Sequence, residues 1–504
     1  MSESPGPLQR VKVDGQHSFD DYAAIAHLAA AASELKAEVA AIVPRLAGRT
    51  VWQVNATVQG GGVAEMLPPI VRLLRDLGIQ TEWAVIGSSD PAFFALTKRL
   101  HNLIHGTGDP ALGAADRELF ERVSRENAAQ LQQLVRPGDV LIVHDPQPLP
   151  LAGLLRAHMP LLTIWRCHIG LDSENDATRA AWEFLAPYLD HYDYAVFSAA
   201  EYIPKRLAGR AVVIYPGIDP LAPKNDELSV RATVEVLCNS GLIPCPGPTL
   251  HGPYPALAQR LLPDGSFAPA NVAESIGLLT RPVVTQISRW DRLKGFAPLL
   301  RAFASLKQGT LGEDSAGDSI QRRRLDLVRL VLAGPDPAGV ADDPEALDVL
   351  DELRAAYTAL HPAIQDEIAL LVLPMQSREQ NALIVNALQR TSTIVVQNSL
   401  REGFGLTVAE AMWKRVPVLS NERACGPRQQ VRDGLDGCLV RDPEDEAELR
   451  RVLEAMLADA PGRRRWGRSA QRRVHDHFLI FNQLRSWAQL FSTAMTRESS
   501  GVSE

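Results

Sequence analysis

An alternation of short apolar runs with helical segments constrains the fold of this chain more than any other feature. It occurs in two stretches, which begin near residues 51 and 282. Strands that alternate with helices indicate a parallel sheet covered by helices on both faces. We therefore predict an α/β fold with two Rossmann-like, doubly wound domains that face each other across a cleft. The predicted strands are 51–56, 81–87, 139–145, 161–168, 194–198 and 211–217 in the first stretch, and 282–288, 327–334, 368–374, 393–397 and 416–420 in the second.

A proline-rich segment at 238–275 separates the two stretches and interrupts the alternation. Prolines and glycines at this density indicate an irregular insertion or linker. A chain of 504 residues is long enough for two or three domains. We predict a first domain over 1–275, with an N-terminal helical extension and this insertion, and a second domain over 276–475. A helix over 476–504 is expected to pack back on the first domain.

The composition argues against several classes of protein. Hydrophobic residues make up 46% of the chain and charged residues 22%, as in globular domains. The net charge of −8 argues against binding to nucleic acid. The N-terminus lacks the apolar segment of a signal peptide, and no apolar run is long enough to span a membrane. The five cysteines form no C-x-x-C pair, so we expect a cytoplasmic protein without a metal site or a disulfide framework.

Three consecutive glycines, Gly60, Gly61 and Gly62, follow the first predicted strand and directly precede a helical pattern. The order G-G-G-V-A-E lacks the G-x-G-x-x-G spacing of a dinucleotide fingerprint, which argues against a dehydrogenase. Backbone amides at a helix start suit a phosphate or a sugar hydroxyl, so we interpret the run as a ligand-facing loop. A tight turn without a ligand is the alternative. Glu65 lies in the first helical turn, where the helix dipole alone favours an acid and a substrate contact is the other interpretation.

The stretch S-L-R-E-G-F-G-L-T-V-A-E-A-M-W is the most specific motif in the chain. Glu402 lies in a loop after a predicted strand, and Glu410 lies eight positions later on the following helix. Gly403 and Gly405 allow backbone amides to face a ligand at the helix N-terminus. One carboxylate can then contact a sugar and the other a more distant pair of hydroxyls. Alternatively, Thr407 and Glu410 form a capping box, in which Glu410 closes its own helix.

Two cations follow the first strand of the second stretch, in the motif Q-I-S-R-W-D-R-L-K-G. Arg289 and Lys294 can clamp a phosphate or a diphosphate, the arginine as a bidentate fork and the lysine as a point charge. Arg292 is expected to face solvent. An exposed basic loop without a ligand is the alternative interpretation.

Polar residues also end two strands of the first stretch, in the motifs H-D-P-Q-P and W-R-C-H-I. Ligands of open α/β sheets bind outside the carboxyl ends of the strands. We therefore expect Asp145, Arg166 and His168 to project toward the same cleft. A single histidine is most often structural, but the place of His168 beside other polar strand ends favours a substrate contact.

Together these motifs resemble those of the trehalose synthase family, which are retaining GT-B glycosyltransferases of family 4. The related retaining trehalose phosphorylases share much of the set. E-G-F-G-L-T-V-A-E matches the E-x7-E pattern of the broad superfamily. The resemblance covers roughly residues 20 to 480. The narrower match is carried by V-N-A-T-V-Q-G-G-G-V-A-E-M-L, H-D-P-Q-P, W-R-C-H-I, P-G-I-D-P-L-A-P-K-N, S-R-W-D-R-L-K-G and E-G-F-G-L-T-V-A-E-A-M-W-K.

The resemblance implies a GT-B fold with an N-terminal acceptor domain and a C-terminal donor domain. The implied reaction transfers glucose from ADP-, UDP- or GDP-glucose to free glucose, forms α,α-trehalose with retention, and needs no metal or other cofactor. The implied partners are the small-molecule substrates, nucleotide-glucose, glucose and trehalose, and a homodimer is common among such enzymes. The alternatives are a retaining trehalose phosphorylase that uses glucose 1-phosphate, a different family 4 hexosyltransferase, and a sugar-nucleotide-binding protein without catalysis.

The resemblance also implies roles for individual residues. Arg289 and Lys294 bind the donor phosphates, Glu402 contacts the transferred glucose, Glu410 contacts the ribose and His168 lies near the sugar. The catalytic set is then Glu402, His168, Arg289 and Lys294. The donor-binding residues are Gly60, Gly61, Gly62, Arg289, Lys294, Gly403, Phe404, Gly405, Leu406 and Glu410, and the substrate-binding residues are Glu65, Asp145, Arg166 and His168.

Two segments depart from the family's pattern. The insertion at 238–275 is longer than expected. The loop R-A-C-G-P-R-Q-Q-V at 423–431 stands where relatives show G-G-I followed by polar residues. Both departures leave the donor and acceptor specificity open.

Overall fold

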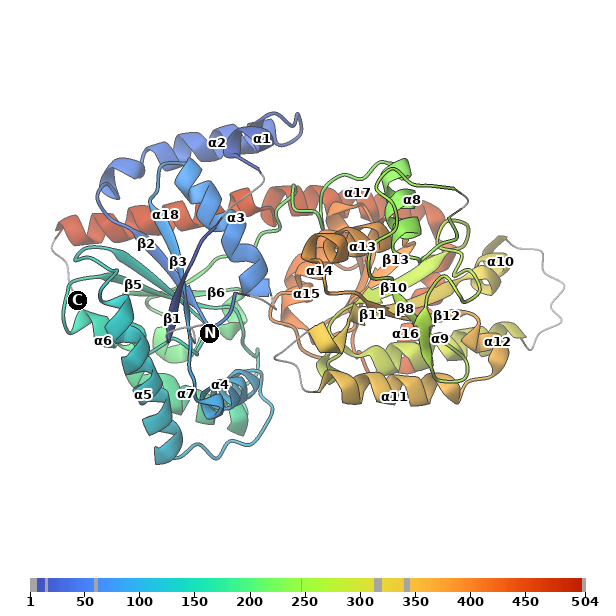
Figure 1. The fold of residues 1–504 in the computed structure, drawn as a ribbon, viewed down its shortest axis with the longest axis horizontal. Coiled ribbons are helices and arrows are strands. Elements are labelled where there is room, and N and C mark those ends of the chain that lie inside the picture. The colour runs from blue at the N-terminus through green and yellow to red at the C-terminus, as the bar shows by residue number, and fades with distance from the viewer. Residues whose placement is uncertain are drawn as a thin grey trace. The chain divides into compact units, whose positions relative to one another are not determined.

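The structure is a computed structural model that describes residues 7–13, 17–58, 62–245, 247–311, 320–339 and 345–500. The chain forms two compact units (Figure 1). The first comprises Met1–Asp219 and His477–Glu504, and the second comprises Pro220–Asp476. No helix in the described ranges is long and apolar enough to cross a bilayer.

The first unit contains a sheet that has seven strands in its described part, in the order β1-β3-β2-β4-β5-β6-β7. β1 is antiparallel to β3, and the other neighbours are parallel. The interior strands β2 and β4 are buried along their whole length, which explains why apolar residues predominate in both. The strands are β1 (Leu8–Val11), β2 (Val51–Asn55), β3 (Thr81–Ile86), β4 (Val140–His144), β5 (Leu162–Cys167), β6 (Tyr194–Phe197) and β7 (Ala211–Val213).

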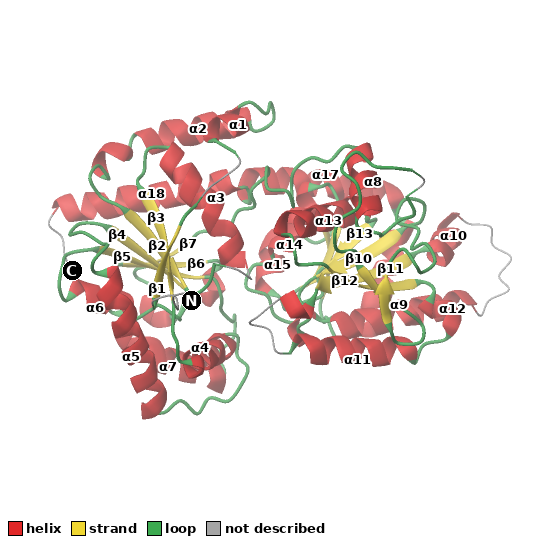
Figure 2. Ribbon diagram, in the orientation of Figure 1, coloured by secondary structure: helices red, strands yellow, loops and turns green. Residues whose placement is uncertain are grey.

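Helices cover both faces of this sheet, as Figure 2 shows. The C-terminal helix α18 packs against α2, and Arg485 on α18 pairs with Glu34 and Glu38 of α2. The expected return of the C-terminal helix to the first unit is thus present in the structure. The helices are α1 (Phe19–Ala23), α2 (Ala29–Ala40), α3 (Gly62–Asp76), α4 (Pro91–Ile104), α5 (Ala114–Leu131), α6 (Leu151–Arg156), α7 (Asp176–Leu189) and α18 (Ile480–Ser500).

The second unit contains a sheet with eight strands among the described residues, in the order β15-β14-β13-β10-β11-β12-β8-β9. The strands from β10 to β15 are parallel, whereas β8 and β9 form an antiparallel edge on β12. Each strand predicted for this half is present, and β8, β9 and β15 were not predicted. The strands are β8 (Gln259–Leu261), β9 (Phe267–Pro269), β10 (Val283–Ile287), β11 (Arg329–Pro335), β12 (Ile368–Leu373), β13 (Ile394–Val396), β14 (Val418–Asn421) and β15 (Gly437–Val440).

Helices also cover both faces of the second sheet (Figure 2). On one face, Phe303, Leu353 and Met456 belong to a large apolar cluster with residues of β10, β11 and β12. The helices are α8 (Val230–Asn239), α9 (Phe296–Leu311), α10 (Ile320–Leu327), α11 (Ala346–Thr358), α12 (Pro362–Gln365), α13 (Arg378–Thr391), α14 (Leu406–Trp413), α15 (Cys425–Gln430), α16 (Glu446–Ala458) and α17 (Ala460–His477).

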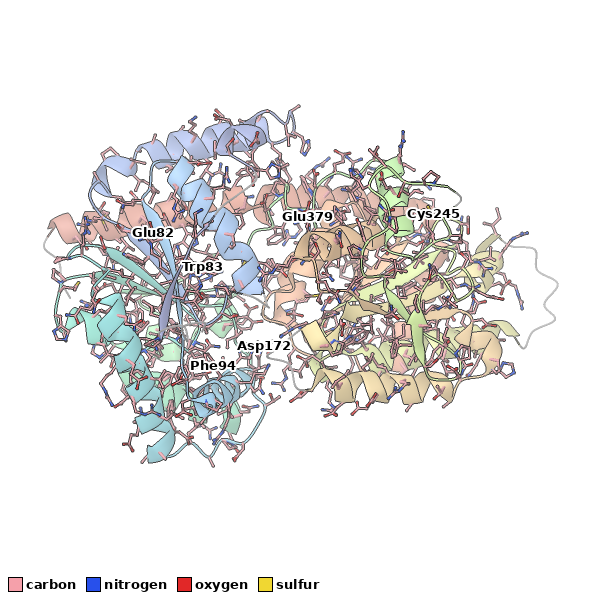
Figure 3. The ribbon with its side chains drawn as sticks, in the orientation of Figure 1. Glu82, Trp83, Phe94, Asp172, Cys245 and Glu379 are labelled. Atoms are coloured by element: carbon pink, nitrogen blue, oxygen red, sulfur yellow. The ribbon has the colours of Figure 1, made fainter. Side chains whose placement is uncertain are left out.

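The predicted domain boundary at residue 275 is wrong, because the proline-rich insertion belongs to the second unit. Arg260 of β8 pairs with Leu371 of β12, which extends the second sheet. Leu242 and Ala270, from the same insertion, are buried in the apolar cluster on the other face of that sheet. Cys245, labelled in Figure 3, lies in the loop that follows α8. Proline content predicts loops, but it does not reveal which core buries the apolar residues between them.

Candidate active site

Glu402 lies in the loop that joins β13 to α14, and three side chains contact one of its carboxylate oxygens, Oε2. Lys294 Nζ lies 2.7 Å from Glu402 Oε2. Ser399 Oγ donates to the same oxygen at 3.1 Å and Gln397 Nε2 at 3.2 Å. The Lys294 and Glu402 side chains are only 14% and 16% exposed, so the pair is largely shielded from water. The structure therefore brings two of the predicted catalytic residues into direct contact.

Lys294 and Arg289 both lie in the loop that follows β10, as predicted. A single 3-10 turn over Arg292–Lys294 begins at Asp291, whose carboxylate accepts from the Leu293 amide at 2.8 Å. Arg289 is half-buried. Arg292 faces solvent, where it pairs with Glu352 on α11, so this expectation is confirmed. The loop thus carries two cations, of which Lys294 contacts the Glu402 carboxylate.

The glycines of the E-G-F-G motif shape the start of α14. Gly405 precedes the helix in a left-handed conformation with φ of 80°, which disfavours a side chain. Any Cβ added there would approach Glu402 Cγ to 3.0 Å. Phe404 is buried and Leu406 begins α14. The motif thus places the backbone of 403–406 next to the Glu402 side chain.

The atypical 423–431 segment packs behind this motif. It folds into α15, whose Gln430 Nε2 donates to the carbonyl oxygens of Phe404 at 2.5 Å and Gly405 at 3.2 Å. The Gly426 amide donates to Glu402 O at 3.3 Å, and a Cβ at Gly426 would overlap the backbone of Phe404. Despite its unusual sequence, the segment fixes the conformation of the predicted donor-binding loop.

Glu410 lies on α14 and is 5% exposed. Lys224 Nζ lies 3.9 Å from Glu410 Oε1. Lys414, one turn later, donates to Glu410 O at 3.1 Å and to Asn225 Oδ1 at 3.3 Å, and burial lowers the pKa of Lys414 to about 7. The capping-box alternative is wrong, because α14 begins after Gly405 and Glu410 therefore lies beyond the third helical position.

A pair of histidines lies at the carboxyl ends of β4 and β5 in the first unit. His144 Nδ1 lies 3.0 Å from His168 Nε2, and His144 Nε2 lies 2.7 Å from Gln53 Oε1. Burial lowers the pKa of His144 to about 3 and holds the pKa of His168 well below 6.5, so both rings are neutral near pH 7.

The hydrogen bonds assign the tautomers of these neutral rings. His144 donates from Nε2 to the Gln53 carbonyl oxygen, so its Nδ1 carries a lone pair and accepts from His168 Nε2. His168 Nδ1 then carries a lone pair as well. This atom is buried and has no hydrogen-bond partner among the described residues. In this state the nitrogen can accept a hydrogen bond but cannot donate one.

Asp145 lies next to this pair in a strained backbone conformation, with φ of 61°. Its Oδ1 accepts from the His168 amide at 2.8 Å, and its carbonyl oxygen accepts from Trp165 Nε1 at 2.9 Å. Burial raises the pKa of Asp145 to about 6. Strain of this kind persists only where surrounding bonds hold it, and it is common at functional sites.

The Arg166 side chain lies inside the protein, and its predicted contact with a ligand stays a prediction. Its side chain is fully buried and donates to Phe197 O at 3.0 Å. Burial lowers the pKa of Arg166 to about 10, since a guanidinium is costly to remove from water. Arg166 therefore links the end of β5 to the end of β6. His168, two residues later, is partly exposed.

The remaining predicted residues are Gly60, Gly61, Gly62 and Glu65. Gly60 and Gly61 fall outside the described residues. Gly62 begins α3 and Glu65 lies in its first turn, and both are exposed. Their ligand contacts stay predictions.

No group of three or more His, Cys, Asp or Glu side chains in the described part of the chain could hold a metal ion. Sequence reasoning missed Gln397, Ser399 and Gln430, which position Glu402 and its loop. Gln397 and Ser399 directly follow a buried strand, and a polar pair at such a place is a signal that could have found them. No local signal marks Gln430, because its partners are 25 and 26 residues away.

Comparison with known proteins identifies relatives along nearly the whole chain. Residues 53–204 match the family described as "Trehalose synthase, N-terminal domain", and residues 273–473 match "Glycosyl transferases group 1". The chain is 31% identical to a trehalose synthase of Pyrococcus horikoshii over 481 residues, which cover 95% of this chain and 97% of that protein. It is 32% identical to a trehalose synthase of Rubrobacter xylanophilus over 492 residues, with coverage of 96% and 99%. A trehalose phosphorylase of Grifola frondosa is 24% identical over 79% of this chain and 51% of its own length.

The fold also has solved counterparts. A crystal structure of an α,α-trehalose 6-phosphate synthase from Burkholderia multivorans matches with a TM-score of 0.65 at 18% identity and covers 90% of this chain and 99% of that one. At this identity the likeness concerns the fold alone. It confirms the predicted α/β architecture of GT-B type.

Proposed function

The chain belongs to the trehalose synthase family of glycosyltransferases, and from this premise we propose that it transfers glucose from a nucleotide-glucose to free glucose and forms α,α-trehalose with retention. As a member it is a hexosyltransferase. The observation that carries the proposal is the 2.7 Å contact between Lys294 Nζ and Glu402 Oε2, on the loop that also carries Arg289. A shielded carboxylate paired with one cation, on a loop that carries a second cation, suits a ligand that joins a sugar to a diphosphate.

Arg289 and Lys294 bind the donor's diphosphate. Their positive charges stabilise the negative charge that grows on the leaving phosphate, a task that is most effective in a site shielded from water. Because these side chains supply the charge, we propose that the reaction needs no metal ion or other cofactor. Glu410 accepts hydrogen bonds from the ribose hydroxyls, and Lys224 Nζ lies 3.9 Å from its Oε1.

Glu402 orients the transferred glucose. Ser399, Gln397 and Lys294 hold its Oε2, which fixes the carboxylate plane. The fixed carboxylate accepts hydrogen bonds from glucose hydroxyls, and the amides of the 403–406 backbone donate to the donor. Orientation of this kind lowers the entropic part of the barrier.

The chemical step exchanges one bond at the anomeric carbon. The acceptor hydroxyl oxygen bonds to C1 of the donor glucose, and the bond from C1 to the phosphate oxygen breaks with its electron pair on the nucleoside diphosphate. The acceptor's proton passes to the departing phosphate oxygen on the same face, so the configuration is retained. No protein base is required, and the residues position the reactants and stabilise charge.

His168 binds a sugar hydroxyl. Its Nδ1 carries a lone pair, is buried, and lacks a hydrogen-bond partner among the described residues, so it accepts from a hydroxyl without displacing an existing bond. Burial keeps the pKa of His168 well below 6.5, so the ring stays an acceptor at neutral pH.

Purified protein incubated with glucose and each of ADP-, UDP- and GDP-glucose tests the proposal. We expect trehalose and the matching nucleoside diphosphate in equal amounts from at least one donor, with or without a chelator such as EDTA. A parallel reaction with glucose 1-phosphate tests the alternative, since part of the chain also matches trehalose phosphorylases. Trehalose formation with glucose 1-phosphate but with no nucleotide-glucose would show a phosphorylase instead. If no donor of either class yields trehalose, both proposals are wrong.

A further inference from the structure

Two of the cysteines lie next to each other where the proline-rich insertion begins. Cys238 lies in the last turn of α8, and Cys245 lies in the loop that follows. Both thiols are reduced in the structure. The Cys238 thiol donates to Pro244 O at 3.8 Å, and it shares a hydrogen bond with the Cys245 side chain. The two sulfur atoms are therefore neighbours, although the sequence contains no C-x-x-C pair.

The end of α8 turns the chain back so that the second cysteine meets the first. Gly241 has a left-handed conformation with φ of 78°. Its amide donates to Cys238 O at 3.0 Å, and the Leu242 amide donates to Leu237 O at 2.9 Å. These two bonds form a Schellman motif, which closes a helix and reverses the chain. The reversal directs residues 242–245 back past the last turn of α8, where Cys238 lies.

Packing and a backbone hydrogen bond hold this turn in place. Leu237, Leu242 and Ile243 are buried together in the apolar cluster on one face of the second sheet. Ser240 O accepts from the Ala258 amide at 3.0 Å, which joins the turn to the segment that leads into β8. The native fold therefore places the two thiols together without any covalent bond between them.

The two thiols differ in their access to solvent. Cys245, labelled in Figure 3, is exposed, whereas Cys238 is only 8% exposed. Burial raises the pKa of Cys238 to about 11, and the hydrogen bond with Cys245 adds to this shift. Because the thiolate is the nucleophile, an oxidant from solvent reacts first with Cys245. Cys238 is then the second thiol, which completes the bond.

We propose that Cys238 and Cys245 are a redox modification site and form a reversible disulfide with oxidants of the glutathione disulfide class. The Cys245 thiolate bonds to one sulfur of oxidised glutathione, and the S–S bond breaks with its electron pair on the departing glutathione. The Cys238 thiolate then bonds to the Cys245 sulfur and displaces the second glutathione. Two cysteine thiols are oxidised, one glutathione disulfide is reduced to two thiols, and both protons pass to glutathione.

Mass spectrometry of the folded protein tests this site. The protein is incubated with oxidised glutathione, then unfolded with iodoacetamide, which blocks every remaining thiol, and digested with trypsin. Residues 232–260 contain both cysteines and no Lys or Arg before Arg260, so one tryptic peptide carries the pair. We expect this peptide without alkyl groups and about 2 Da lighter than its dithiol form. After treatment with dithiothreitol it should carry two alkyl groups.

The controls use single cysteine variants. Cys438→Ser removes another thiol whose pKa burial raises to about 11, and it should leave formation of the bond unchanged. Cys238→Ser should stop at a glutathione adduct on Cys245. Two alkyl groups on the wild-type peptide at every glutathione concentration would overturn the proposal, and so would a bond that forms only after unfolding in urea. The wild-type peptide decides even if a variant fails to fold.

Urea unfolding provides a second measurement. A disulfide restricts the unfolded chain, here through a short loop over residues 238–245. We expect oxidised wild-type protein to unfold at a higher urea concentration than the reduced protein, and Cys245→Ser to unfold at the same concentration under both conditions. A lower midpoint for the oxidised wild type would show that the native fold does not hold the sulfur atoms at bonding distance, which would overturn the proposal.

Discussion

At the scale of single residues, one carboxylate oxygen connects the loops after β10 and β13. Glu402 Oε2 accepts from Lys294, Ser399 and Gln397, although Lys294 is 108 residues away in the chain. Three donors thus fix the plane of this carboxylate.

Glu402→Gln should lower kcat by about 10²-fold or more while the protein remains folded, because the charged acceptor for the glucose hydroxyls is lost while the side-chain shape is kept. Steady-state kinetics with the preferred donor, together with a thermal melt, measures both effects. Glu352→Gln, which removes a surface partner of Arg292, is the control and should keep normal turnover. Near-normal turnover of Glu402→Gln would remove Glu402 from the mechanism.

His144 should make the protein sensitive to acid. Its pKa is lowered from 6.5 to about 3 by burial. Below pH 6.5 the unfolded chain binds a proton at this residue that the folded protein does not bind, so the free energy of unfolding falls as the pH drops toward 3. Between pH 7 and pH 4.5, the free energy of unfolding of His144→Gln should therefore fall by about 2–3 kcal/mol less than that of the wild type.

Urea unfolding at the two pH values measures this difference. Asp145, whose raised pKa of about 6 acts in the opposite direction, is present in both proteins and cancels in the comparison. His158→Gln changes an exposed histidine and serves as the control. The same pH dependence in His144→Gln and the wild type would show that His144 is not held neutral in the folded state.

At the scale of elements, the short helix α15 supports the 402–405 loop, which we propose binds the donor. Gln430 bonds to two carbonyl groups of that loop, and Arg473 on α17 in turn donates to Gln430 O at 2.6 Å. Gly426 allows α15 to approach Phe404 closely. The unusual 423–431 sequence therefore retains the packing that the loop requires.

Gly426→Ala should raise KM for the nucleotide donor about tenfold or more. The added Cβ would overlap the Phe404 backbone, so the 402–405 loop must shift, and small shifts in a binding site are costly. Overpacking should also lower the free energy of unfolding by about 1–3 kcal/mol. Donor titrations and urea unfolding measure the two effects.

Gly209→Ala is the matched control, because a Cβ there meets no atom within 4 Å. It should leave KM unchanged. An unchanged KM in Gly426→Ala as well would show that the position of the loop does not depend on α15.

At the scale of the whole molecule, the order of segments along the chain differs from the division into units. The first unit is completed by the last helix of the chain, and the proline-rich insertion completes the second. On α18, Phe481 is fully buried and packs edge-to-face on Tyr22, with ring centroids 5.5 Å apart. The C-terminal helix is therefore part of the core of the first unit.

Phe481→Ala should lower the free energy of unfolding by about 3–5 kcal/mol, since it removes a buried aromatic ring and leaves a cavity. Phe94→Ala, in the same unit, removes a ring that is 39% exposed (Figure 3) and should cost far less. Urea unfolding of both variants measures the difference. An equal decrease in the free energy of unfolding of the two variants would contradict a core role for α18.

Local patterns in the sequence determined the strands, the alternation with helices and the motifs at the strand ends. Continuous burial imposes continuous apolar runs, and phosphate-binding loops need glycines and cations at short spacing. For these reasons Arg289, Lys294, Glu402 and Glu410 could be named before the structure was known. The resemblance to a family drew on the same short motifs.

Only the tertiary structure decided which segments complete each unit and which side chains are buried. The insertion's β8 joins β12, more than 100 residues later, and Gln430 reaches Phe404 from a separate helix. Arg166 and His168 both lie near one strand end, yet the first side chain is fully buried and the second residue is partly exposed. Such outcomes depend on contacts between distant segments, which no local periodicity records.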